Sequence, residues 1–151
     1  MKTTLTLSPS LSALAKNTAG HLDVLVQLSA PAMATKVDRP SLNLAIVIDC
    51  SGSMGGQPIQ EAKRAAIHLI NKLQKGDLVC VASYGSSVQV DAEPVDAEAG
   101  RQQLISAIER LSASGGTPLR AGWLSGAQAI APFVSKYGMS RVLLLSDGQA
   151  T

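Results

Sequence analysis

A carboxylate and two hydroxyls follow an aliphatic stretch in the first half of the chain. The segment reads Leu42-Asn-Leu-Ala-Ile-Val-Ile-Asp-Cys-Ser-Gly-Ser-Met54, which places Asp49, Ser51 and Ser53 at alternate positions after the apolar residues. Oxygen ligands of this kind suit a hard cation such as Mg2+, which takes one or two carboxylates, retains several waters and disfavours soft ligands. The pattern Asp-x-Ser-x-Ser therefore marks a candidate metal site.

Two later segments offer further oxygen ligands. Thr117 lies in Ser114-Gly-Gly-Thr-Pro-Leu119, and Asp147 follows the apolar run in Arg141-Val-Leu-Leu-Leu-Ser-Asp-Gly148. Each piece alone also fits a structural role, because Ser/Gly-rich turns commonly cap helices, and Thr117 is expected as an N-cap with Pro118 at the first helical position. The metal site is favoured because three separate segments of the chain, in this order, all place oxygen ligands at one end of the expected sheet.

The hydrophobic periodicity predicts the elements that position these residues. Parallel strands are expected over residues 42–48, 77–84 and 141–146, and helices over residues 58–73, 97–111 and 118–131. Each helix returns the chain so that the next parallel strand begins at the same edge. Thr117 and Asp147 thereby reach the edge that carries Asp49, and ligands of open α/β sheets bind at the carboxyl ends of the strands.

The region between the first two helices is less regular. A hairpin loop is expected at residues 85–87, followed by a short antiparallel strand around residues 88–90. The acidic segment from Asp91 to Glu98 is interpreted as a solvated loop with Asp96 capping the next helix, because it lacks the Asp/Asn alternation and glycine turn of a calcium loop. Trp123 and Phe133, in the third helix and at its end, are assigned to packing.

Taken together, the ligand candidates resemble the metal-ion-dependent adhesion site of von Willebrand factor A (vWA) domains. That site has the pattern Asp-x-Ser-x-Ser, a distant Thr, and an Asp after another apolar strand. All five positions have a counterpart here, namely Asp49, Ser51, Ser53, Thr117 and Asp147. The resemblance implies an α/β fold with a doubly wound, Rossmann-like vWA sheet, of the bacterial intracellular type.

The resemblance also implies a binding chemistry. Ser51 and Ser53 are expected to bind the metal directly, Thr117 directly or through water, and Asp49 and Asp147 largely through water. The expected ion is Mg2+, with Mn2+ or Ca2+ as alternatives. Few direct anionic ligands leave the ion electron-poor, so an Asp or Glu carboxylate of a partner protein fills the open coordination position.

The resemblance covers residues 41–151, about the first two-thirds of a vWA domain. It implies the strand order 3-2-1-4 with strands 5 and 6 absent, so that strand 141–146 lies at an edge and invites pairing with a second copy. Residues 1–40 stand outside the vWA pattern. Their alternating segments Thr4–Leu7 and Leu22–Leu28 predict an N-terminal antiparallel β extension, followed by a linker from Pro31 to Pro40.

Composition narrows the remaining function classes. The chain has 151 residues, 46% of them hydrophobic, which is enough for one soluble core. A formal charge of +2 and an aromatic content of 3% do not indicate nucleic-acid binding. The first residues lack the apolar region of a signal peptide and no run is long enough for a membrane span, so a cytoplasmic location is expected.

Two alternatives to metal-dependent partner binding stay open. A metal-independent interaction scaffold would keep the fold without using the site. A metal-assisted hydrolase is disfavoured, because neither His21 nor His68 is placed by pattern as a general base and no Gly-x-Ser-x-Gly elbow is present. The chain is therefore expected not to be an enzyme.

Overall fold

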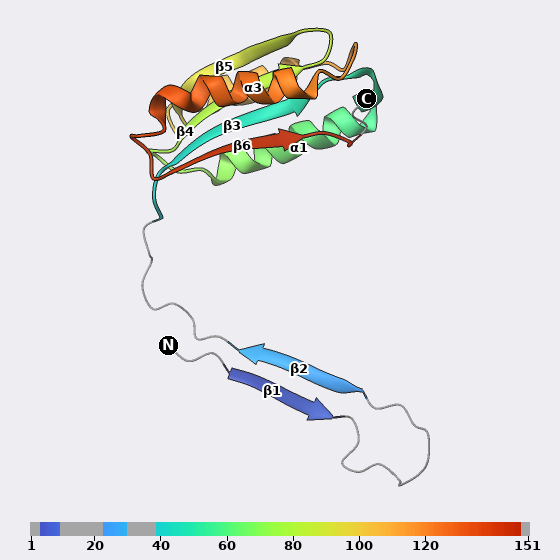
Figure 1. The fold of residues 1–151 in the computed structure, drawn as a ribbon, viewed down its shortest axis with the longest axis vertical. Coiled ribbons are helices and arrows are strands. Elements are labelled where there is room, and N and C mark those ends of the chain that lie inside the picture. Colours follow the sequence, from blue (N-terminus) through green and yellow to red (C-terminus); the bar gives the residue numbers. More distant parts are fainter. Residues whose placement is uncertain (1–3, 10–22, 30–38, 149–151) are drawn as a thin grey trace. The chain divides into compact units, whose positions relative to one another are not determined.

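The computed structural model describes residues 4–9, 23–29 and 39–148. The chain divides into two compact units, Met1–Asp38 and Arg39–Thr151 (Figure 1). Most of the expected linker, residues 31–38, lies outside the described residues. No helix in the described part combines the length and the apolar character that crossing a membrane requires.

The first unit contains an antiparallel pair of strands, as expected. Strand β1 (Thr4–Pro9) pairs with β2 (Val24–Ser29), with Leu5 opposite Leu28 and Leu7 opposite Val26. Directly opposed residues share a face of the ribbon, so these four apolar side chains lie on one face. All four are about 60% exposed or more.

The second unit is built on a four-stranded mixed sheet. Its strands are β3 (Leu42–Asp49), β4 (Leu78–Tyr84), β5 (Val88–Asp96) and β6 (Met139–Leu145), in the order β5-β4-β3-β6. Strand β3 runs parallel to β4 and β6, whereas β5 is antiparallel to β4. In sequence order this is the expected arrangement 3-2-1-4. The central position of β3 explains why almost every residue in it is apolar and buried.

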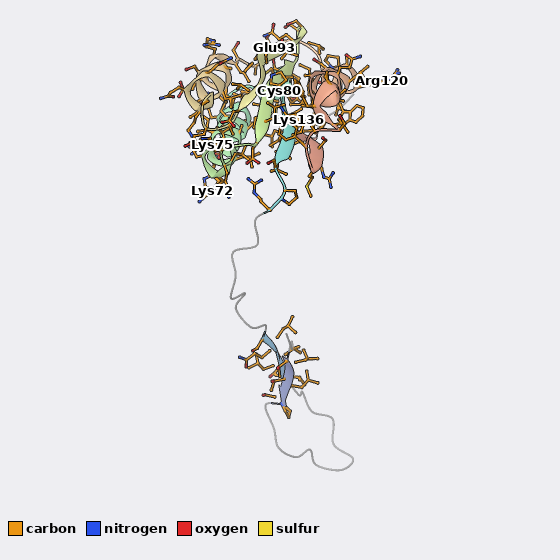
Figure 2. The ribbon with its side chains drawn as sticks, turned by 90° about the vertical axis from the view of Figure 1, so that its left-hand side faces the viewer. Lys72, Lys75, Cys80, Glu93, Arg120 and Lys136 are labelled. Carbon is orange, nitrogen blue, oxygen red and sulfur yellow. The ribbon has the colours of Figure 1, made fainter. Side chains whose placement is uncertain are left out.

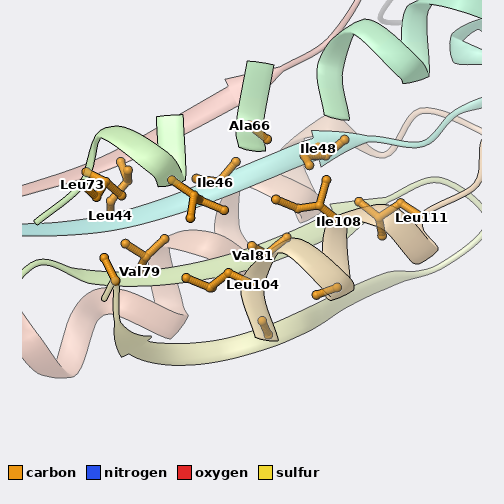
Figure 3. Packing of buried hydrophobic residues seen from close by; sticks show 14 of the residues in the cluster. Leu44, Ile46, Ile48, Ala66, Leu73, Val79, Val81, Leu104, Ile108 and Leu111 are labelled. Atoms are coloured by element: carbon orange, nitrogen blue, oxygen red, sulfur yellow. The ribbon is translucent and has the colours of Figure 1, made fainter. Parts of the chain in front are cut away.

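Helices cover both faces of this sheet (Figure 1). Helices α1 (Gln57–Lys72) and α2 (Arg101–Arg110) pack on one face, against Ile46 and Ile48 of β3 (Figure 3). Helix α3 (Leu119–Ile130), which continues as a 3-10 turn over Ala131–Phe133, packs on the other. The alternation of side chains along β3 thus supplies two cores, one above and one below the sheet.

Helix α3 lies unusually close to the sheet because two glycines face it. A Cβ atom on Gly122 would lie 2.2 Å from Cδ1 of Tyr84, and one on Gly126 would lie 2.5 Å from Cγ2 of Val47. Both glycines are buried. The spacing of four residues places them on the same side of the helix, so the backbone itself packs on the strands.

The surface of the second unit is charged and its interior is mainly apolar. Figure 2 shows Cys80 inside the unit, and the exposed Lys72, Lys75, Glu93 and Arg120 around it. Cys80 is fully buried between apolar neighbours, as a small hydrophobic residue would be. Burial raises the pKa of its thiol to about 12, with the charge of Glu93 as a second cause.

Two expectations for the region after β4 were wrong. The segment from Asp91 to Asp96 is not a loop but continues β5, because it pairs with β4 as far as Leu78 opposite Asp96. Helix α2 begins at Arg101 rather than at residue 97. Asp96 does accept hydrogen bonds from the backbone N–H groups of Glu98 and Ala99, at 3.0 and 3.1 Å, but these order the turn that precedes the helix.

A buried carboxylate fixes the end of the sheet opposite the candidate site. Asp77, only 2% exposed, accepts backbone N–H bonds from Leu42 at 3.0 Å and Gln74 at 2.8 Å. Both of its oxygens also contact the Arg39 guanidinium, one at 2.8 Å. One side chain therefore joins the start of β3 to the loop between α1 and β4.

Candidate functional site

The candidate ligands lie where the parallel strands β3 and β6 end. Residues 50–56 follow β3, residues 85–87 follow β4, and residues 146–148 follow β6. Residues 111–118, between α2 and α3, approach the same edge, because their backbone bonds to residues 50–52. The topology thus gathers four loops at the carboxyl ends of parallel strands, where α/β sheets bind ligands.

Backbone hydrogen bonds fix two of these loops beside each other. The N–H of Ser114 donates to the carbonyl of Cys50 at 2.6 Å, and the N–H of Gly52 donates to the carbonyl of Gly115 at 2.9 Å. The N–H of Ser86 adds a bond to the carbonyl of Ser114 at 2.9 Å. Gly115 has a φ of +83°, which a residue with a side chain rarely adopts. Thr117 therefore follows a loop whose path is set by main-chain contacts.

Asp49 is fully buried and accepts hydrogen bonds from three parts of the chain. Its Oδ1 accepts the backbone N–H of Ser51 at 2.8 Å. Its Oδ2 accepts two hydroxyls, from Tyr84 at 3.0 Å and from Ser146 at 2.8 Å. These donors come from three different segments, so the carboxylate ties the end of β3 to the end of β4 and the loop after β6.

These hydrogen bonds decide the charge of Asp49. Burial by itself disfavours the carboxylate, but the bonds from Ser51, Ser146 and Tyr84 together outweigh it and hold the pKa of Asp49 below its ordinary value. Burial and the adjacent Asp49 raise the pKa of Tyr84 to about 12, so its hydroxyl remains a donor. The site therefore holds an ionised carboxylate at neutral pH.

The two serine hydroxyls stand next to this carboxylate. Oγ of Ser51 and Oγ of Ser53 are 3.1 Å apart; Ser51 is buried and Ser53 is exposed. Neighbouring ligands of an octahedral Mg2+ with bonds of about 2.1 Å lie about 3.0 Å apart. The serine pair thus has the separation of two adjacent ligands of one such ion, and one of the pair faces solvent.

Thr117 and Asp147 lie on the flanking loops. Thr117 is half-buried and comes two residues after the bonded Gly115. The sequence predicted Thr117 as the N-cap of α3, and this prediction was wrong. The helix begins at Leu119, and Pro118 occupies the cap position. Asp147 is exposed and adjoins Ser146, and its charge helps to raise the pKa of Tyr84. Hydrogen bonds therefore join Asp49 to Ser51 and Ser51 to Ser53, whereas Thr117 and Asp147 lie on other loops at the same edge of the sheet.

Two residues of the site were missed by sequence reasoning. Tyr84 is the last residue of β4, and Ser146 directly precedes Asp147. No spacing rule links either to the Asp-x-Ser-x-Ser pattern. A hydroxyl-bearing residue at the end of a mainly apolar strand was the available signal for Tyr84.

Soft ligands do not contribute to the site. In the described segments, no three His, Cys, Asp or Glu side chains cluster as a metal cage would need. Cys50 lies within the motif, but burial, together with the charges of Asp91 and Asp49, raises the pKa of its thiol to about 11. A protonated, buried thiol is a poor ligand, so the candidate donor set consists of oxygens.

The second unit is similar in sequence to known proteins. Residues 44–149 match the family model described as von Willebrand factor type A domain. The chain is 37% identical over 122 residues to the uncharacterized protein sll0103 of Synechocystis sp., which covers 78% of this chain and 29% of that protein. It is 32% identical over 121 residues to inter-alpha-trypsin inhibitor heavy chain H1 of Bos taurus, covering 72% of this chain and 13% of that protein.

A solved structure shares the fold. The vWF domain of the type V pili tip protein Mfa5 from Porphyromonas gingivalis matches with a TM-score of 0.64 at 24% identity, covering 74% of this chain and 39% of that chain. The present chain spans less than a third of the length of the two sequence relatives. The similarity therefore concerns one α/β unit within larger proteins.

Proposed function

Because the chain belongs to the von Willebrand factor type A domain family, a class of protein-interaction module, we propose that it binds a partner protein through a divalent cation at the edge where β3 and β6 end. The proposed ligands are Asp49, Ser51, Ser53, Thr117 and Asp147, and the proposed ion is Mg2+, with Mn2+ or Ca2+ as alternatives. The partner group is an Asp or Glu carboxylate.

The serine pair beside Asp49 carries this proposal. The 3.1 Å between the hydroxyls of Ser51 and Ser53 fits adjacent positions of an octahedral ion, and Ser53 is open to solvent. A bound Mg2+ supplies an electrophilic centre to which a carboxylate can bind. The hydroxyls of Ser51 and Ser53 would be neutral direct ligands, and Asp49 supplies a carboxylate that its hydrogen bonds keep ionised. The loop that carries Thr117 is kept in place by its backbone bonds to Cys50 and Gly52.

Titration calorimetry with Mn2+ and Mg2+ tests this function. Wild-type protein is expected to bind either ion, and Asp49→Asn is expected to bind about 10 to 100 times more weakly, because it loses the charge that orients the hydroxyl ligands. Thr117→Val should also weaken metal binding, whereas Thr117→Ser, which keeps the hydroxyl, should bind the metal as wild type does. Thermal melting of each variant shows whether the fold is kept. Equal binding by wild type and Asp49→Asn would remove the metal assignment and favour the metal-independent scaffold.

A catalytic role receives no support from the site. His68 is exposed on α1, and in the described residues no histidine bonds to Asp49, Ser51 or Ser53. The matched proteins are named as a heavy chain of an inhibitor, a pilus tip protein and an uncharacterized protein, none of them as an enzyme. The expected bacterial cytoplasmic location stays a prediction, as does the absence of strands 5 and 6.

The second proposed partner is another copy of the chain, which would pair along β6. In the described residues β6 pairs with β3 on one side only. A groove of about 330 Å³ lies on its α1 side, lined by Leu44, Leu69 and Leu143, and one of about 400 Å³ on its α3 side includes Trp123. A strand edge with apolar grooves and neither a proline nor a bulge favours pairing.

Light scattering over a concentration series checks this pairing. The apparent mass of the chain is expected to rise with concentration, and Leu143→Lys should keep it monomeric, because the charge would be placed beside the new strand. The matched control is Gln128→Lys, which adds the same charge on the exposed surface of α3. A wild-type chain that stays monomeric at high concentration contradicts the pairing.

A further inference from the structure

We propose that Tyr84 and Ser146 are positioning residues that hold the Asp49 carboxylate out of direct contact with the metal. The inference rests on the proposed metal-dependent function and adds two residues to it. Neither residue belongs to the Asp-x-Ser-x-Ser pattern, and both act through Asp49.

The protein uses three of the four acceptor positions of Asp49, including both positions on Oδ2. A carboxylate oxygen offers about two lone-pair positions. Oδ2 receives both the Tyr84 hydroxyl at 3.0 Å and the Ser146 hydroxyl at 2.8 Å. Oδ1 receives the N–H of Ser51 at 2.8 Å. A direct metal bond to Oδ2 would therefore displace one of these two hydroxyls.

Both donors are fixed in place by their surroundings. Tyr84 is fully buried, and its ring lies so close to Gly122 that a Cβ there would be 2.2 Å from Cδ1. The Oγ of Ser146 accepts the backbone N–H of Gly148 at 3.1 Å, so its hydroxyl hydrogen remains available for Asp49. Packing holds one hydroxyl and a turn holds the other.

This arrangement links metal binding to partner binding. A directly bound carboxylate would strengthen the hold on the cation but cancel part of its charge. With Asp49 held back, the direct ligands from this loop are the neutral hydroxyls of Ser51 and Ser53, and the cation keeps its attraction for an incoming anion. Tyr84 and Ser146 thus favour capture of an external carboxylate at the expense of metal affinity.

The test frees Oδ2 without removing Asp49. The double variant Tyr84→Phe, Ser146→Ala keeps the ring against Gly122 but loses both hydroxyls, and Tyr137→Phe removes a hydroxyl elsewhere as the matched control. Calorimetry measures Mn2+ affinity, and Mn2+ electron paramagnetic resonance in 17O-enriched water counts the bound waters. Acetate is the carboxylate probe of the Mn2+-loaded proteins, and urea unfolding reports whether each variant is folded.

The double variant is expected to bind Mn2+ about tenfold more tightly, because the charged Asp49 carboxylate can then contact the ion directly. It should also have fewer bound waters and weaker acetate binding than wild type or Tyr137→Phe. A folded double variant with the wild-type water count and no gain in Mn2+ affinity overturns the role of Tyr84 and Ser146, although the metal site itself stands. A wild-type protein that binds no Mn2+ overturns the proposed function together with this inference. If the double variant does not fold, Tyr84→Phe alone is measured, and the same two readouts apply with a smaller expected change.

Discussion

Gly122→Ala is expected to lower the free energy of unfolding by about 2 to 4 kcal/mol, although alanine favours a helix by about 1 kcal/mol over glycine. The added Cβ would lie 2.2 Å from Cδ1 and 2.6 Å from Cγ of Tyr84. Neither side can yield easily, because Tyr84 is fully buried and its hydroxyl is bonded to Asp49. Either α3 moves away from the sheet or the ring leaves the site.

Urea unfolding measures this effect, with Gly116→Ala as the control. Nothing lies within 4 Å of a Cβ built on Gly116, so that variant should stay within about 0.5 kcal/mol of wild type. Gly126→Ala, with Val47 at 2.5 Å, should resemble Gly122→Ala in stability but leave Tyr84 in place. A Gly122→Ala protein as stable as wild type would show that α3 does not pack on the sheet as closely as the structure indicates.

Asp77→Ala is expected to destabilise the second unit by about 3 kcal/mol or more. The change leaves the N–H groups of Leu42 and Gln74 without their acceptor and removes the partner of Arg39. A part-buried donor left unpaired costs about 1 to 3 kcal/mol. Arg39 is 36% exposed and adds little by charge alone. Asp77→Asn keeps one carbonyl oxygen and should lose about half as much, again by urea unfolding.

The pH dependence of stability gives the same carboxylate a second test. Burial disfavours the charged form of Asp77, but the bonds from Arg39, Gln74 and Leu42 outweigh it, so its folded pKa lies below the ordinary value. Its contribution is therefore fully present above the unfolded pKa of about 3.9 and is lost as the pH falls through the lower, folded pKa. Unfolding free energies between pH 7 and pH 3 should fall less steeply for Asp77→Asn than for wild type. Parallel curves would contradict this role.

The central elements could be predicted because burial leaves a clear pattern in the sequence. Strand β3 is apolar on both faces, and α1 repeats apolar residues such as Ile59, Ala66 and Ile70 at helical spacing. Those patterns, with the rule that a crossover returns the chain to the same edge, were enough to place Asp49 and Asp147 at one end of the sheet. The strand order, in contrast, came from the resemblance to vWA domains and not from these patterns.

Features set by long-range contacts could not be predicted. The segment Asp91–Asp96 is acidic, yet it forms a strand because β4 offers an unpaired edge along its length. Trp123 was assigned to packing but is 48% exposed, because the helix turns the glycines toward the sheet and places Trp123 outside. Tyr84 and Ser146 reach Asp49 only when the chain folds, and no local sequence pattern predicts that contact.

Backbone hydrogen bonds limit how the sequence of this domain can change during evolution. They join Cys50 to Ser114 and Gly52 to Gly115. Main-chain atoms make these contacts, so mutation of the side chains at positions 50 and 114 leaves the donors and acceptors in place. Selection can then change the side chains at the rim of the loops, while the spacing of the Ser51 and Ser53 hydroxyls is inherited intact. Glycine is the exception at position 115, where a Cβ would lie 2.4 Å from Oγ of Ser86. Mutational drift at this end of the sheet is therefore expected to be broad in side-chain chemistry and narrow in backbone shape.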